Sequence, residues 1–150
     1  MADAFLTGII TAKGRETLAK AFAQVNGSAN SFAFKFKYGE GGYIQTASGR
    51  VPKDPADGVA LTDVEAVDLG LFSYEKNFSP TDVTFAFPSA LTMRCRLIEL
   101  EANDSGAGEN PRFFELGIFD QNDNLVAYAT VPEQTKTGNK ILTNYVQIVF

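Results

Sequence analysis

The spacing of apolar residues predicts one helix near the N-terminus. Its apolar face follows the i, i+3, i+4, i+7 pattern of an amphipathic helix and consists of Leu18, Ala21, Phe22 and Val25. Thr11 is a suitable N-cap, and Gly27 lies where a left-handed residue would end the helix. Gly14 is expected to weaken the first turn, because glycine costs about 1 kcal/mol relative to alanine within a helix.

Beyond this helix the period of the pattern changes to two, which predicts strands. The segment 32–38 alternates between an aromatic face and a face with Lys35 and Lys37, which we expect to be solvated. At Leu97–Ile98 the apolar positions shift by one residue, which indicates a bulge or a new strand. The other predicted strands are 64–72 with a bulge at Gly70, 83–87, 91–97, 113–119, 125–131 and 141–150.

Polar, glycine-rich and proline-rich stretches separate these strands. Residues 45–63 form an extended loop in this interpretation, long enough to be a candidate contact arm. Turns or polar connections are predicted at 102–111, 120–124 and 132–140. One helix followed by strands predicts a single α+β domain over residues 1–150. We expect it to be predominantly antiparallel β-sheet, sandwich-like, with the helix at its N-terminus.

The composition of the chain excludes several kinds of catalytic and binding site. The 150 residues carry a formal net charge of −5 and include no histidine, which excludes Ser-His-Asp and Cys-His catalysis and histidine-ligated zinc. The acidic balance argues against nucleic-acid binding. The one cysteine, Cys95, lies among apolar positions of its strand and is expected to be a small buried hydrophobe. We expect no cofactor and no metal.

The sequence gives no sign of membrane insertion or export. No apolar run approaches the roughly 20 residues that a membrane-spanning helix needs. The N-terminus lacks the basic region and apolar run of a signal peptide. We therefore expect a chain that is used unprocessed, begins in a cytoplasm and has no membrane partner.

Two short segments invite a ligand-binding interpretation. The run Gly39-Glu40-Gly41-Gly42 resembles a phosphate-binding loop only superficially, because it lacks the lysine and the following helix that such loops need. The Asp/Asn-rich segment 120–124 could suggest calcium, but Leu125 and Val131 occupy the positions where an EF-hand needs glycine and glutamate. Both are interpreted as turns.

Carboxylates remain as candidates for glycosidase chemistry, which requires no histidine. The available residues are Glu40, Glu65, Glu99, Glu101 and Glu115. Glu99 and Glu101 share one strand face, which is more simply a solvated face. Arg94 and Arg96 share a face in the same way; we expect them to meet neighbouring carboxylates, with an anion site as the alternative.

Two stretches resemble the phage tail-collar fibre family. The first runs from Leu6 through the helix and a strand to a glycine-rich turn, whose matching residues are Gly39, Glu40 and Gly41. The second, FELGIFD at 114–120 followed by NLVAYA at 124–129, is similar to a hairpin of that family. Its matching residues are Glu115, Gly117, Phe119 and Asp120. The family often has Asp-Gly-Asn in this turn; here Asp123 or Asn124 would supply the residue with positive φ.

This resemblance implies a non-catalytic structural module that anchors a fibre to the baseplate of a contractile phage tail. Such modules are typically trimeric, so the expected partners are other copies of the chain and other baseplate or fibre proteins, and the expected location is the virion. The sequence ends at Phe150 directly after the resembling stretch. We therefore expect an adaptor or baseplate component rather than a fibre that recognises the host.

Aromatic residues are candidates for the contact surface. Of the 18 aromatic residues, 13 are phenylalanine, and aromatic side chains are enriched at protein interfaces. The residues proposed to be buried between subunits are Phe72, Tyr74, Phe78 and Tyr43. The alternative is that they all face the core of their own chain. A small carbohydrate-binding or receptor-binding β-sandwich at the tail tip is the alternative function.

Overall fold

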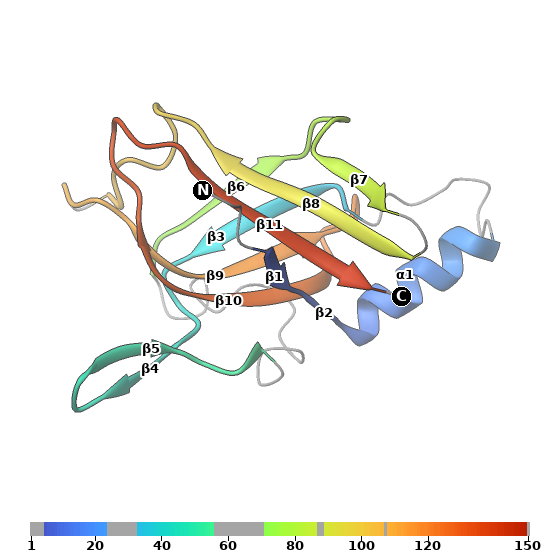
Figure 1. The fold of residues 1–150 in the computed structure, drawn as a ribbon, viewed down its shortest axis with the longest axis horizontal. Coiled ribbons are helices and arrows are strands. Elements are labelled where there is room, and N and C mark those ends of the chain that lie inside the picture. The colour runs from blue at the N-terminus through green and yellow to red at the C-terminus, as the bar shows by residue number, and fades with distance from the viewer. Residues whose placement is uncertain (1–4, 24–32, 56–70, 87–88, 107, 150) are drawn as a thin grey trace.

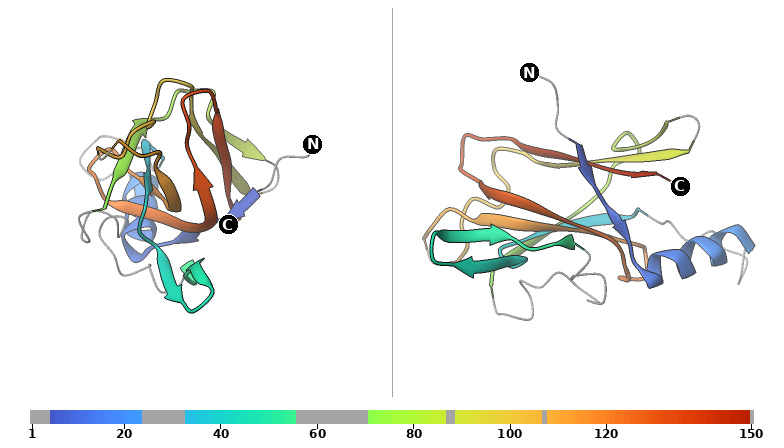
Figure 2. Two further views of the ribbon diagram at one scale, coloured as in Figure 1. Left: turned by 90° about the vertical axis from the view of Figure 1, so that its left-hand side faces the viewer. Right: turned by 60° about the horizontal axis from the view of Figure 1, so that its bottom comes forward.

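The computed structural model describes residues 5–23, 33–55, 71–86, 89–106 and 108–149. Two β-sheets face each other as a sandwich, a helix extends from one end, and a separate hairpin projects below (Figures 1 and 2). The elements are β1 (Phe5–Thr7), β2 (Ile9–Ile10), α1 (Ala12–Ala23), β3 (Lys35–Gly39), β4 (Tyr43–Thr46), β5 (Gly49–Pro52), β6 (Ser73–Asn77), β7 (Val83–Ala86), β8 (Ala90–Leu97), β9 (Arg112–Phe119), β10 (Leu125–Thr135) and β11 (Leu142–Val149).

The strands form two large sheets and one small one. The first sheet has the order β1-β11-β8-β7, and the second has the order β2-β10-β9-β3-β6. The β4–β5 hairpin forms the third sheet by itself. Every pairing in the described part of the chain is antiparallel except that of β1 with β11. This architecture confirms the predicted α+β class, with mostly antiparallel, sandwich-like sheet and one N-terminal helix.

The core lies between the two large sheets. Alternate residues of each strand point into it, as the period-two pattern predicted. The first sheet contributes Met93, Cys95, Leu97, Val146 and Ile148, and the second contributes Phe36, Tyr38, Leu116, Ile118 and Ala127. Burial of each large apolar side chain contributes roughly 1.5–3 kcal/mol to the free energy of folding. Cys95 is fully buried, as predicted.

The N-terminal segment passes from one sheet to the other at Gly8. Its β1 part pairs with β11 in the first sheet, and its β2 part pairs with β10 in the second. A Cβ atom on Gly8 would lie 2.8 Å from Cγ1 of Val146. Only glycine therefore lets the backbone cross this closely over the core and close one side of the sandwich.

Helix α1 is fixed to the second sheet at its first turn. The Thr11 hydroxyl accepts the N–H of Gly14 at 2.9 Å, which confirms the predicted N-cap, and donates to the carbonyl of Leu125. A Cβ on Gly14 would lie 2.2 Å from the Val126 carbonyl oxygen. Gly14 therefore serves close helix–strand packing, which offsets its low helix propensity. The predicted helix end at Gly27 lies outside the described residues.

No described helix has the length and apolarity needed to cross a membrane.

The predicted strand 32–38 is shorter than expected and its basic face is partly covered. The strand β3 begins at Lys35; Phe34 precedes it, and Phe32 lies outside the described residues. The Lys35 ammonium pairs with Glu75 at 2.9 Å and with Asp123. Burial alone would lower the pKa of Lys35, but these two carboxylates raise it above its usual value. The prediction of a merely solvated face is therefore wrong for Lys35.

The prediction of a loop at 45–63 is wrong over its described first part. Residues 43–46 and 49–52 form the β4–β5 hairpin, and residues 56–63 lie outside the described residues. Gly49 and Pro52 suggested a loop, yet Gly49 begins a strand and Pro52 ends it. Each strand has only four residues, too few for the alternation to stand out.

Three other boundaries differ from the prediction. Of the strand predicted at 64–72, residues 64–70 lie outside the described residues, and the strand present is β6, which follows Phe72. The shift at Leu97–Ile98 marks the end of β8 and a turn, not a bulge or new strand. The strand β10 continues to Thr135 through a register irregularity between Thr130 and Gln134, which accommodates a proline within the strand.

Candidate interaction site

The β4–β5 hairpin is the candidate contact element of the chain. We call residues 43–52 the arm. Ile44 of β4 lies directly opposite Val51 of β5, and these side chains are 50% and 42% exposed. The arm thus presents an apolar pair on one face while it projects away from both large sheets (Figures 1 and 2). The predicted contact arm at 45–63 therefore has a described structural counterpart, although its role in contact remains a prediction.

The other face of the arm packs on the domain. The ring of Tyr43 lies 5.2 Å from that of Phe114, measured between ring centroids. The Arg50 guanidinium lies 4.8 Å from the centre of the Tyr43 ring on the neighbouring strand. These contacts orient the arm, so that its apolar pair faces outward.

The arm begins at a buried glycine. Gly42 has φ +77°, and a Cβ there would lie 2.7 Å from Cβ of Glu115. The carbonyl of Gly42 accepts the N–H of Lys53 at 3.0 Å, and the carbonyl of Lys53 accepts the Thr130 hydroxyl at 2.8 Å. The base of the arm is therefore closed by a backbone hydrogen bond and attached to the second sheet by the Thr130 side chain.

The first motif, Gly39-Glu40-Gly41, connects β3 with the arm. The N–H of Glu40 donates to the Phe72 carbonyl at 3.1 Å, and its carboxylate accepts the N–H of Arg112 at 3.0 Å. Gly39 ends β3, and Gly39 and Gly41 are buried. The segment is a bend, in agreement with the interpretation as a turn. The Glu40 carboxylate accepts a backbone hydrogen bond and so attaches this bend to the start of β9.

The second motif forms the turn between β9 and β10. Asp120 is fully buried and accepts four hydrogen bonds of 2.8–3.1 Å, from the N–H groups of Asn122 and Asn124, the Asn124 amide and the Thr17 hydroxyl. Burial alone would raise the pKa of Asp120, but these donors hold it below its usual value. Asp123 has φ +64°, which confirms one of the two positions predicted to replace the family's glycine.

The other residues of the second motif are buried in β9. The carboxylate of Glu115 accepts the Tyr128 hydroxyl at 2.7 Å, beneath Gly42. Gly117 pairs with Lys37 of β3 and Tyr128 of β10. The Lys37 ammonium lies 5.1 Å from the centre of the buried Phe119 ring. The structure thus places the first motif and Glu115 together at the base of the arm. Phe119 and Asp120 lie at the far end of β9, where Asp120 contacts Thr17 of helix α1.

The four aromatic residues predicted to form a subunit interface are partly buried within their own chain. Phe72 stacks on Phe113, Phe78 packs on Phe36, and Tyr43 packs on Phe114, whereas Tyr74 lies against the core. Tyr74 belongs to strand β6, not to a loop. Intramolecular packing therefore accounts for much of their surface, and their role between subunits stays a prediction.

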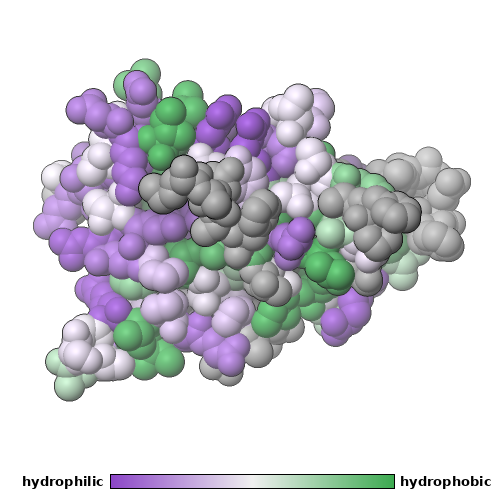
Figure 3. Space-filling model, viewed as in Figure 1, coloured by the Kyte–Doolittle hydropathy of each residue, from purple (hydrophilic) through white to green (hydrophobic). Residues whose placement is uncertain are grey.

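The large apolar residues most exposed among those described form a different set. They are Phe34, Ile44, Val51, Phe85, Ile98, Leu100, Ile141 and Val149. Apolar residues show as green patches at several places on the molecular surface in Figure 3. The sequence analysis did not identify this set as exposed, because four of its members, Phe34, Ile98, Leu100 and Ile141, lie just outside the strands.

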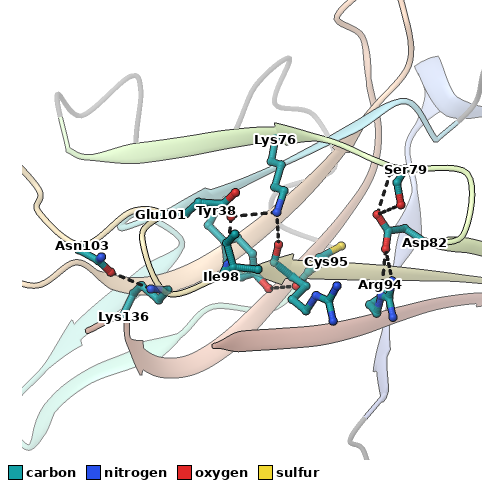
Figure 4. A network of polar contacts seen from close by, with 11 residues as sticks. Tyr38, Lys76, Ser79, Asp82, Arg94, Cys95, Ile98, Glu101, Asn103 and Lys136 are labelled. Carbon is teal, nitrogen blue, oxygen red and sulfur yellow. Dashed lines mark hydrogen bonds and ion pairs between the residues drawn. The ribbon is translucent and has the colours of Figure 1, made fainter. Parts of the chain in front are cut away.

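A network of charged and polar groups closes the side of the sandwich between β6 and β8 (Figure 4). The Lys76 ammonium donates to the Arg96 carbonyl at 3.2 Å and to the Glu101 carboxylate at 2.9 Å, and Glu101 also accepts the N–H of Ile98. Glu101 therefore does not lie on a solvated strand face as predicted. An inward-pointing lysine on an edge strand also discourages further strand pairing there.

Asp82 and Arg94 form the second part of this network. Their ion pair measures 2.8 Å, which confirms that Arg94 meets a carboxylate, whereas Arg96 is exposed. Burial alone would raise the pKa of Asp82, but hydrogen bonds from Ser79 and Arg94 lower it. The charges in this network neutralise one another in pairs, an arrangement that favours structural stabilisation.

The interior of the sandwich holds further polar groups. The Tyr38 hydroxyl donates to the Cys95 carbonyl at 2.7 Å and accepts the Asn144 amide at 2.9 Å. The fully buried Lys136 donates to the Asn103 side chain at 2.7 Å, and burial lowers its pKa against the opposing effect of nearby Glu101. Burial raises the pKa of the Cys95 thiol far above its usual value, which keeps it protonated and unreactive.

The acidic residues considered for glycosidase or metal chemistry are dispersed. Glu40, Glu101 and Glu115 each hold a different group, Glu99 lies in an exposed turn, and Glu65 lies outside the described residues. No cluster of three or more metal-ligating side chains occurs in the described ranges. A polar hollow lined by Glu109, Asn110, Arg112, Glu133 and Thr135 has no aromatic lining residue on which a sugar ring could stack.

Comparison with known proteins adds no relative to this description: no protein-family model, no curated protein and no solved structure matches the chain.

Proposed function

We propose that this chain is a non-catalytic structural component of a contractile phage tail, an oligomeric adaptor that joins a tail fibre to the baseplate. The observation that supports a contact function is the exposure of the arm. Its Ile44–Val51 pair is about half exposed, while the opposite face of the arm packs on the domain through Tyr43. The assignment to a phage tail is supported by the two ordered sequence motifs around Glu40 and Asp120.

The arm suits contact with another protein for a physical reason. A two-stranded hairpin is at best marginally stable by itself, and gains stability when a third strand or another surface covers its apolar face. Among the residues that the structure describes, one face of the hairpin is covered by the packing of Tyr43 on Phe114, and the other face carries the exposed Ile44 and Val51. A partner that buries Ile44 and Val51 would add apolar burial without any rearrangement of the domain.

The first motif and Glu115 of the second motif support the arm. Glu115 and Tyr128 lie directly beneath Gly42, and the Glu40 carboxylate ties the bend before the arm to Arg112 of β9. A motif that fixes the base of a contact element is what an attachment module requires. We expect the functional assembly to be a homo-oligomer, with a trimer as the form suggested by the resemblance, located in the virion.

Mass spectrometry of purified tail particles from the phage that encodes the chain is the direct test. We expect the chain among the tail proteins at a fixed ratio to a baseplate protein. Particles assembled with the double substitution Ile44→Asp and Val51→Asp should lose fibres or another tail component, whereas Leu100→Asp, at an exposed leucine elsewhere, should assemble normally. Absence of the chain from complete tails would contradict the proposal.

A further inference from the structure

Strand β7 is an open edge of the first sheet. Its four residues, Val83–Ala86, pair with β8 on one side, and no other strand of the described chain pairs with them. Its other side therefore carries backbone N–H and C=O groups that a further strand could bind. The edge has no charged residue and no proline, the two features that commonly protect such edges.

An apolar groove of about 400 Å³ accompanies this edge. Its lining includes Phe34, Phe78, Pro80, Val83 and Leu91, which lie at the mouth of the sandwich between the two sheets. Phe85, the register partner of Leu91, points to the same side as Val83 and is 69% exposed. A strand added to β7 would therefore bury apolar side chains as well as satisfy backbone groups.

The arm offers a strand of the same length as β7 and an exposed apolar face, which are the features that a strand added to β7 would need. Strand β4 has four residues, as β7 has, and pairs in the described chain only with β5. Strand β5 lies against β10 of its own chain, so β4 is the strand of the arm that is available for a further partner. Ile44 and Val51 give the arm one exposed apolar face.

The arm of a chain cannot reach the β7 edge of the same chain. The arm projects from the side of the second sheet, whereas β7 is an edge strand of the first sheet. The two elements lie far apart in all three views (Figures 1 and 2). An arm that pairs with this edge must therefore come from another molecule. The chain itself supplies a hairpin of matching length and polarity.

We infer that β4 of the arm of one copy pairs with the β7 edge of a second copy, which places Ile44 beside Phe85 and near the groove that Val83 lines. Main-chain hydrogen bonds supply affinity in such strand addition, and side-chain burial supplies selectivity. Because arm and edge are different surfaces, the contact is heterologous: each copy offers one arm and one edge, and the series closes into a ring or extends as a filament.

This inference rests on the proposed contact function of the arm and names its partner. It is tested by disulfide formation between copies that each carry one introduced cysteine. Neighbouring residues on paired strands have Cβ atoms about 4.5–5.5 Å apart, within reach of a disulfide after modest adjustment. Cys95 is fully buried, so it does not compete.

Purified Ile44→Cys and Phe85→Cys chains are mixed and oxidised, and the linked peptides are identified by mass spectrometry. We expect a cross-linked dimer in this mixture and at least tenfold less when Leu100→Cys replaces Phe85→Cys. Leu100 is 91% exposed, but it follows the end of β8 whereas β7 pairs with the start of β8. Equal cross-linking in both mixtures, or in Ile44→Cys alone, would overturn the inference.

Native mass spectrometry of the full chain gives a measurement that does not depend on strand register. Ile44→Asp and Phe85→Asp should each weaken self-association at least tenfold, whereas Leu100→Asp should leave it unchanged; circular dichroism checks that all three are folded. Self-association that neither substitution weakens, or a monomeric wild type, defeats the inference. Tail particles that contain the chain would then still support the proposed function, so the two failures are distinguishable.

Discussion

The β9–β10 and β4–β5 hairpins differ in how far their polar and apolar groups are satisfied within the chain. The β9–β10 hairpin lies inside the second sheet, and its turn residue Asp120 accepts four hydrogen bonds from its own chain. The β4–β5 hairpin forms a separate sheet and leaves the Ile44–Val51 pair half exposed. The first hairpin is buried within its own chain, whereas the second keeps an exposed apolar pair that a partner would bury under the proposed function.

This difference shows that one chain can use one set of residues to stabilise its fold and a different set as surface for binding another protein. A group whose hydrogen bonds and apolar contacts are all made within its own chain stabilises the fold. Such a group offers little to a partner, since it has no free donor and no exposed apolar surface. Groups that are left half buried cost stability in the isolated chain and provide binding surface in an assembly. The two hairpins meet at Glu115 of β9, which lies directly beneath Gly42 at the base of the arm.

The largest expected effect is on the internal hairpin. Asp120→Ala removes the acceptor of four hydrogen bonds, including that of the buried Thr17 hydroxyl, and should lower the free energy of unfolding by about 3 kcal/mol. Thermal unfolding should shift down by about 6–12 °C. Glu133→Ala, at an exposed carboxylate, is the control and should shift it little. If Asp120→Ala lowered the free energy of unfolding no more than Glu133→Ala, the hydrogen bonds of Asp120 would not stabilise the β9–β10 hairpin as argued.

A pair of glycine substitutions sharpens the comparison at the arm. Gly42 and Gly49 both have positive φ, but only Gly42 has neighbours within 4 Å of an added Cβ. Gly42→Ala should cost about 2 kcal/mol, because backbone strain is joined by overlap with Glu115. Gly49→Ala should cost about 1 kcal/mol, because the arm can adjust locally. Denaturant unfolding measures both, and equal costs would show that the arm is as constrained at its tip as at its base.

The smallest expected effect is the response to acid. The pKa of Asp120 is lower in the folded chain than in the unfolded chain, so its contribution is complete above about pH 4 and is lost as the pH falls through the folded pKa. The free energy of unfolding of the wild type should therefore fall on acidification from about pH 6 to about pH 2.5. The difference in free energy of unfolding between wild type and Asp120→Asn should become smaller over the same range. Denaturant midpoints at the two pH values measure this, and a constant advantage would show that Asp120 does not titrate as described.

The sequence by itself determined the class of fold and most of its core. The helix cap at Thr11, the inward positions of β8 and β11, and the positive φ at Asp123 all follow from local patterns, because side-chain period and turn chemistry depend on neighbouring residues. Burial of Cys95 follows from its parity in the strand.

Only the tertiary structure decided what lies around these elements. Gly14 and Gly8 serve close approaches to Val126 and Val146, which are distant in sequence. The arm was predicted as a loop, and the inward Lys76 could not be distinguished from a solvated lysine, because short polar strands carry little periodic signal. Whether an apolar residue such as Ile44 is covered depends on contacts across the whole domain, and no local pattern contains that information.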